Sequence, residues 1–229
     1  MTPIATVTGT AGKPIRVGSF PAAIATATNT AGKPITVGDY PVAVAVTPDG
    51  RTAYVANAGS GTVTPIATAT NTAGSPIGVE GEPAALAITP NGKTVYVVSS
   101  TSYGVTRIAA ATNKVVGTID LNPNAGIQPG GLCGIAIAPS GTTVYVTSDL
   151  ANTVTPIVTA TNTAGSPISF GPSDGRGVCA IAVTPDGATA YVAINGNNGV
   201  IPLATATNTA GSPVYVGGRP VAIALTPGR

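Results

Sequence analysis

One short phrase recurs along the chain and constrains its fold more than any other feature. Residues 40–57 read YPVAVAVTPDGRTAYVAN, in which two apolar runs flank a Pro-Asp-Gly turn. Proline pre-sets φ in such a turn and glycine tolerates a positive φ, so the phrase predicts a β-hairpin. The same hairpin returns at 84–99, 133–148 and 179–194, and a half copy, PVAIALTPGR, begins at residue 220.

A second segment follows each hairpin and completes a repeat. Residues 61–79, GTVTPIATATNTAGSPIGV, predict a strand, a Thr-Asn-Thr-Ala-Gly turn and a short outer strand at Pro76–Val79. The turn prolines at 48, 90, 139, 185 and 227 are separated by 42, 49, 46 and 42 residues. Four short strands in a period of 40 to 50 residues are typical of β-propeller blades.

The fold class is therefore all-β, a propeller of four-stranded antiparallel blades. Four complete blades are expected at 42–79, 84–120, 131–170 and 178–217, within a single domain over 1–229. The first strand of each blade is apolar on both faces, which fits a strand between neighbouring sheets.

Both ends of the chain depart from the repeat. Residues 21–38 predict an incomplete blade, because the turn motif recurs there after 20 residues instead of 42. At the other end, 220–226 predicts a lone inner strand, which would meet outer strands from 2–17 and close the ring. The total is five to six blades, and the sequence leaves closure open.

Proline and cysteine add two local expectations. Prolines at 3, 65, 156 and 202 remove a hydrogen-bond donor from the third strand of a blade, which predicts a bulge or local mispairing there. Cys133 and Cys179 hold the same apolar position in adjacent repeats. We expect buried free thiols. A disulfide between neighbouring inner strands is the alternative, and it depends on the Cα separation.

Composition excludes several function classes. The chain has no histidine and no tryptophan, only 8% of its residues are charged, and its net charge is +2. It lacks the basic footprint of a nucleic-acid-binding protein and the apolar run of about 20 residues that a membrane helix needs. The first residues carry no export signal and begin inside a repeat, which suggests a fragment or a shortened gene.

Candidate ligand-binding residues lie in the loops that precede each inner strand. They are Asp39, Glu80, Glu82, Asp174 and Arg176. Carboxylates gathered at a channel mouth could bind a cation such as Ca²⁺. A solvated rim is the simpler interpretation, so we predict no metal, cofactor or catalytic residue. Asp49 and Asp186 are assigned to organising their turns.

The recurrent Tyr-Val phrase after Pro-Asp-Gly carries a family resemblance. Ala53-Tyr54-Val55-Ala56-Asn57 and Val144-Tyr145-Val146-Thr147 resemble the YVTN-type β-propeller repeat. The resemblance implies a surface-layer or secreted protein, hence an extracellular or cell-surface location. Similar repeats occur in quinoprotein-like and lactonase-like propellers. The acidic residue typical of the third strand is replaced here by alanine or valine, so no role of that residue carries over.

Three hypotheses about function follow. The first is a non-enzymatic scaffold or interaction module that binds a protein or glycan and is itself a monomer. The second is a lactonase-like or quinoprotein-like enzyme with its site at the channel mouth. The third is a truncated repeat fragment without independent function.

Overall fold

The computed structural model describes residues 34–121, 131–171, 177–195 and 198–225. These residues form four antiparallel sheets and no helix, so none of them belongs to a helix that could cross a membrane. Each sheet corresponds to one predicted repeat, and we number them blades 1 to 4.

The strand bounds follow the repeat closely. Blade 1 contains β1 (Pro41–Val46), β2 (Thr52–Asn57), β3 (Thr62–Ala67), β4 (Thr72–Ala73) and β5 (Ile77–Gly78). Blade 2 contains β6 (Pro83–Ile88), β7 (Thr94–Ser99), β8 (Gly104–Ala109) and β9 (Lys114–Asp120). Blade 3 contains β10 (Leu132–Ile137), β11 (Thr143–Ser148), β12 (Thr153–Val158), β13 (Thr163–Ala164) and β14 (Ile168–Ser169). Blade 4 contains β15 (Val178–Val183), β16 (Thr189–Ile194), β17 (Gly199–Ala204), β18 (Thr209–Ala210) and β19 (Val214–Tyr215).

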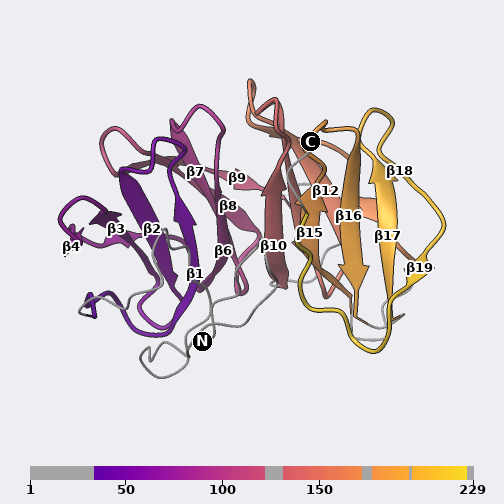
Figure 1. Ribbon diagram of the computed structural model, residues 1–229, viewed down its shortest axis with the longest axis horizontal. Coiled ribbons are helices and arrows are strands. Elements are labelled where there is room, and N and C mark those ends of the chain that lie inside the picture. Colours follow the sequence, from indigo (N-terminus) through magenta and orange to yellow (C-terminus); the bar gives the residue numbers. More distant parts are fainter. Residues whose placement is uncertain (1–33, 122–130, 172–176, 196–197, 226–229) are drawn as a thin grey trace, which may run out of the picture.

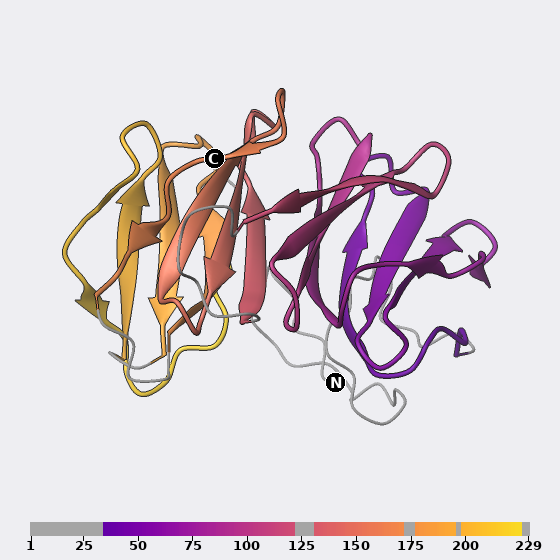
Figure 2. The ribbon, with the colours of Figure 1, turned by 180° about the vertical axis from the view of Figure 1, so that it is seen from behind.

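The blades are arranged side by side in an arc. The inner strands β1, β6, β10 and β15 follow one another across the middle of the molecule, and blades 1 and 4 lie at opposite ends in both views (Figures 1 and 2). Within each blade the strands pair in chain order from the inside outward. The expected all-β propeller architecture is confirmed.

The outer edge of each blade carries a one-residue bulge. In blade 1 the pairing shifts between Ile66↔Ala73 and Val63↔Ile77, opposite Pro65, and the outer strand is split into β4 and β5. The predicted bulge at proline is confirmed, and the outer strand expected over Pro76–Val79 is present as the shorter β5. The extra strand β4 was not expected, because Thr72–Ala73 lies in the segment predicted to be a turn. Blade 2 has the same shift next to Arg107, where no proline stands, and there β9 continues unbroken. The bulge therefore belongs to the blade, and the prolines only interrupt the ladder.

Three apolar cores lie between the blades. The core between blades 1 and 2, for example, joins Tyr54 and Val63 of one sheet to Val95, Val97 and Ile108 of the next, all at most 2% exposed. Equivalent clusters join blades 2 and 3 and blades 3 and 4. Each blade is thus stabilised mainly by its neighbours, as in other repeat proteins.

A hydrogen bond from a tyrosine to an asparagine accompanies each core. The Tyr54 hydroxyl donates to Asn113 Oδ1 at 2.6 Å, across the junction between blades 1 and 2. At the next two junctions Tyr96 donates to Asn162 at 3.1 Å and Tyr145 donates to Asn208 at 3.4 Å. The asparagines stand in the outer turns of their blades with φ between 53° and 55°, a conformation that asparagine tolerates well. We call each pair a Tyr–Asn latch.

The two cysteines are joined, contrary to the expectation of free thiols. Cys133 on β10 and Cys179 on β15 have their Cα atoms 5.3 Å apart and form a disulfide between blades 3 and 4. The inner strands approach closely because Gly134 packs against the Cys179 carbonyl, where a Cβ would overlap the oxygen. A Cα separation of this size is normal for a disulfide.

The irregular ends are only partly covered by the structure. Residues 220–225 belong to no strand, so the lone inner strand expected at 220–226 is wrong for the residues that can be described. Their expected partner, 2–17, lies outside the described residues, as does most of the incomplete blade at 21–38.

Candidate functional site

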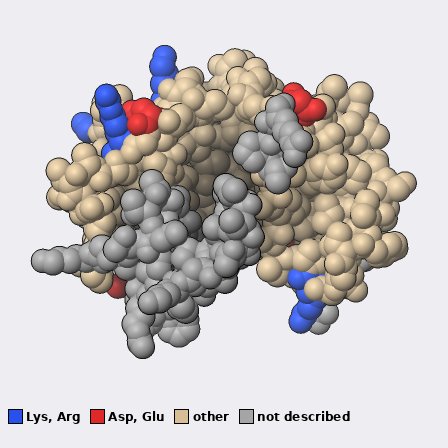
Figure 3. All heavy atoms as spheres, viewed as in Figure 1, with Lys and Arg blue, Asp and Glu red and all other residues tan. Residues whose placement is uncertain are grey.

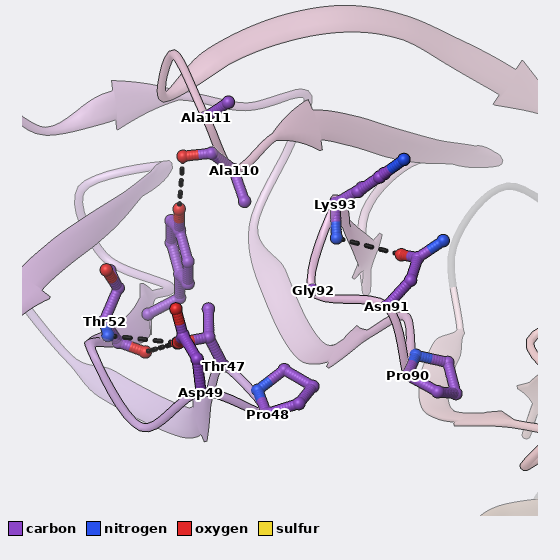
Figure 4. A pocket seen from close by; sticks show the side chains of 11 residues that line it. Thr47, Pro48, Asp49, Thr52, Pro90, Asn91, Gly92, Lys93, Ala110 and Ala111 are labelled. Atoms are coloured by element: carbon purple, nitrogen blue, oxygen red, sulfur yellow. Dashed lines mark hydrogen bonds between the residues drawn. The ribbon is translucent and has the colours of Figure 1, made fainter.

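A cavity of the described structure is a groove between the hairpin turns of blades 1 and 2. Its volume is about 540 Å³, which is within the size range of ligand pockets. The turn Thr47–Asp49 forms one wall, the turn Pro90–Lys93 forms the other, and Ala110 and Ala111 close one end (Figure 4). We call this cavity the turn groove.

The turn groove is polar at the turns, but those polar groups already have partners. Asp49 Oδ1 accepts from the Thr47 hydroxyl at 2.6 Å and from the backbone N–H of Arg51 at 3.0 Å. These hydrogen bonds hold the pKa of Asp49 below its usual value. Asn91 makes the equivalent contacts, accepting from Thr89 at 2.7 Å and from the Lys93 N–H at 3.0 Å. Asp186 organises the turn of blade 4 in the same way, so the structural role expected of Asp49 and Asp186 is confirmed.

Tyr54 also lines the groove. Its side chain is fully buried, and its hydroxyl donates to Asn113 and lies 3.4 Å from the Ala110 carbonyl oxygen. Burial raises the pKa of Tyr54 above its usual value. The phenol is therefore a neutral donor at neutral pH and acts as a structural group rather than as a base.

The charged groups that can still contact a ligand lie at the edge of the groove. Lys93 is exposed, and none of the described residues forms an ion pair with it. Asp49 lies 3.9 Å from Arg51, with 57% of its side chain exposed, so that contact is loose. The turn groove therefore offers an apolar floor of proline and alanine with one ammonium and one carboxylate at its rim.

A second cavity lies in the central hollow of the arc. It has a volume of about 270 Å³ and is lined by the inner strands β6, β10 and β15 together with 221–223. Its walls comprise alanine, isoleucine, valine and glycine beside the disulfide. Figure 3 shows the surface hollowed between the two halves of the arc, with few charged side chains on this face. The described lining offers no carboxylate.

The candidates from sequence lie at the other end of the blades. Asp39, Glu80 and Glu82 are exposed and precede β1 or β6, whereas the turn groove follows those strands. Their backbone N–H groups donate to serine or threonine hydroxyls, such as Glu82 to Thr101 at 2.9 Å.

The described carboxylates do not gather into a metal site. Nowhere in the described part of the chain do three or more acidic, cysteine or histidine side chains come together as ligands. Asp174 and Arg176 lie outside the described residues.

The turn groove was not among the sites predicted from sequence. In the sequence, each turn was interpreted by itself as a structural element. The groove forms because two such turns from adjacent blades face each other, which the sequence of one turn does not indicate. The available signal was the exposed Lys93, since the equivalent positions in the other turns are Arg51, Thr142 and Ala188.

Comparisons with known proteins support the fold. No protein-family model matches the chain, and no curated protein matches its sequence. Among solved structures, virginiamycin B lyase from Staphylococcus aureus aligns with a TM-score of 0.66 at 14% identity, covering 80% of this chain and 58% of its own. Hydrazine synthase from Kuenenia stuttgartiensis aligns with a TM-score of 0.48 at 18% identity, covering 80% and 76%. The chain thus spans little more than half the length of the lyase, and that likeness shows a shared propeller fold.

Proposed function

We propose that this chain is a non-enzymatic propeller scaffold that binds a protein or glycan partner in the turn groove. One observation carries the proposal: the polar side chains that recur in the repeats are used to build turns and to join blades. Asp49 and Asn91 bind their own turns, and Tyr54 binds the next blade. An enzyme of the lactonase-like or quinoprotein-like kind would need convergent polar groups whose hydrogen-bonding atoms are not already engaged within the fold.

The groove suits recognition of a partner's side chain or sugar. Its apolar floor can pack against an aliphatic or ring surface, and Lys93 and Asp49 at the rim can each form a directional contact. Binding of a partner would need no rearrangement of the turns, because the hydrogen bonds within each turn already fix its conformation.

The disulfide supports an extracellular or cell-surface setting of the kind that the YVTN-type resemblance implies. Disulfides persist in oxidising compartments and are rare in the cytosol of most organisms. The bond between Cys133 and Cys179 joins two blades, so it would stabilise the scaffold outside the cell.

The test is a binding screen with a matched pair of variants. Labelled protein is applied to glycan and peptide arrays, and hits are measured by titration. Lys93→Glu should weaken a true groove ligand at least tenfold, whereas Lys114→Glu, an equal charge change at an exposed position of β9, should not. Turnover of a lactone or another bound ligand by the purified protein would refute the scaffold proposal, and equal losses in both variants would refute the groove.

A further inference from the structure

The two end blades present faces that the interior blades bury. Blades 1, 2 and 3 each use a tyrosine and a valine on the face toward the next blade, and these side chains are at most 2% exposed in all three. In blade 4 the same positions are Tyr191 and Val200, and both are partly exposed. Val214 and Val216, on the outer strand and just after it, are each 55% exposed.

Blade 1 has the complementary face. Ala53 and Val55 stand where blades 2, 3 and 4 bury Val95 and Val97 or their equivalents, yet both are partly exposed. Asn71 occupies the latch position with φ 53°, the same conformation as the three engaged asparagines. Among the described residues, neither Asn71 nor Tyr191 has a latch partner.

The undescribed segments of the same chain cannot supply a tyrosine that would complete the latch at Asn71. All seven tyrosines lie in the described residues, and residues 1–33 contain none. Tyr191 is the remaining tyrosine at the latch position, but it is in blade 4, at the opposite end of the arc from blade 1 (Figures 1 and 2). A tyrosine that fits Asn71 in the way Tyr54 fits Asn113 must come from another molecule.

We propose that blade 4 of one copy docks on blade 1 of a second copy and continues the blade series. The contact reproduces the interface that the chain already forms three times between its own blades, with Tyr191 donating to Asn71 of the second copy. This is a head-to-tail contact, which closes a ring where the rotation allows. Two copies supply eight described blades, which is within the range that propellers adopt. The proposal departs from the expected monomer and is independent of the partner in the turn groove.

The test uses variants that block one end each. Val214→Asp with Val216→Asp places charge on the blade 4 face, and Val55→Asp places charge on the blade 1 face. Val115→Asp, a 42% exposed valine on the outer strand of blade 2, is the matched control. Analytical ultracentrifugation over a range of concentrations gives the mass of each species, and circular dichroism confirms that each variant is folded.

The pattern of masses decides the proposal. The unmodified chain and the control should associate into multiples of 22.1 kDa, and each blocked variant alone should stay monomeric. Mixing the two blocked variants should restore a 1:1 complex, because each retains one free face. Tyr191→Phe, a milder change, should weaken association roughly three- to tenfold.

Two results would overturn the proposal. One is an unmodified chain that stays monomeric at every soluble concentration; if Val214→Asp with Val216→Asp then lowers its melting temperature, the chain's own residues cover blade 4. The other is association that the mixed blocked variants fail to restore.

Discussion

The Tyr–Asn latches predict a graded series of stability losses. Tyr54→Phe removes a hydroxyl that donates at 2.6 Å, Tyr96→Phe one at 3.1 Å and Tyr145→Phe one at 3.4 Å. A good O–H···O bond has a donor–acceptor distance of roughly 2.5–3.0 Å. The first latch is within that range, the second is just beyond it and the third is well beyond it.

The distances set the expected magnitudes. One intramolecular hydrogen bond contributes about 1 kcal/mol net, so Tyr54→Phe should lower the free energy of unfolding by about 1 kcal/mol and Tyr145→Phe by a few tenths of that. For a chain of this length, about 1 kcal/mol corresponds to a fall of roughly 2–4 °C in melting temperature. Tyr191→Phe is the internal control, because no described residue accepts from its hydroxyl in a single copy, and it should leave the monomer unchanged.

Urea unfolding followed by circular dichroism, at protein concentrations low enough to exclude association, measures the series. A double-mutant cycle of Tyr54→Phe with Asn113→Gly isolates the pair, since glycine also tolerates the positive φ at that turn. The reasoning is wrong if Tyr145→Phe costs as much as Tyr54→Phe, if Tyr191→Phe costs as much as either, or if the cycle shows no coupling.

Three further outcomes test other contacts. Gly134→Ala should cost roughly 1–3 kcal/mol or more in urea unfolding, because its Cβ would overlap the Cys179 carbonyl; Gly78→Ala, with nothing within 4 Å, should change stability far less. Replacing both cysteines by alanine should lower the free energy of unfolding by up to about 4 kcal/mol, from the loop entropy of a 46-residue separation. A melting temperature unchanged by dithiothreitol would contradict this. Burial raises the pKa of the three latch tyrosines; the unfolded chain ionises first, so the contribution of these tyrosines to stability should be constant below about pH 10 and stability should fall above it. An alkaline titration that melts the Tyr54→Phe variant and the unmodified chain alike would exclude that role for Tyr54.

The sequence was most informative about structure within one blade. The hairpin Tyr40–Asn57 contains its own turn chemistry and strand pattern, so local rules suffice to place β1 and β2. The bulge opposite Pro65 was also predictable, because proline cannot donate to a ladder. Arg107 shows that the reason was incomplete: the bulge persists in blade 2 without proline, and it reflects how the outer strand pairs in every blade.

Contacts between blades could not be predicted from local sequence patterns. Tyr54 and Asn113 are 59 residues apart, and nothing near either residue indicates the other. Both residue types recur once per repeat, which was the available signal, but recurrence alone also fits packing and turn roles. The pairing of Cys133 with Cys179 likewise depended on a separation between strands that Gly134 sets and that spacing in the sequence cannot give.

The sites where a partner could be recognised follow from what the repeats do not share. The turns read TPDGR, TPNGK, APSGT and TPDGA in order along the chain. All four build the same hairpin, so selection for the fold alone does not distinguish them. Among the three described junctions, only that of blades 1 and 2 places a turn with aspartate opposite a turn with lysine, and that junction forms the turn groove. At the junction of blades 2 and 3, the turn TPNGK faces APSGT. At the junction of blades 3 and 4, APSGT faces TPDGA, which ends in alanine. A partner that binds charged side chains can therefore distinguish this junction from the other two, although all three have the same backbone. For this reason the groove hypothesis depends on Lys93 rather than on the repeated Pro-x-Gly.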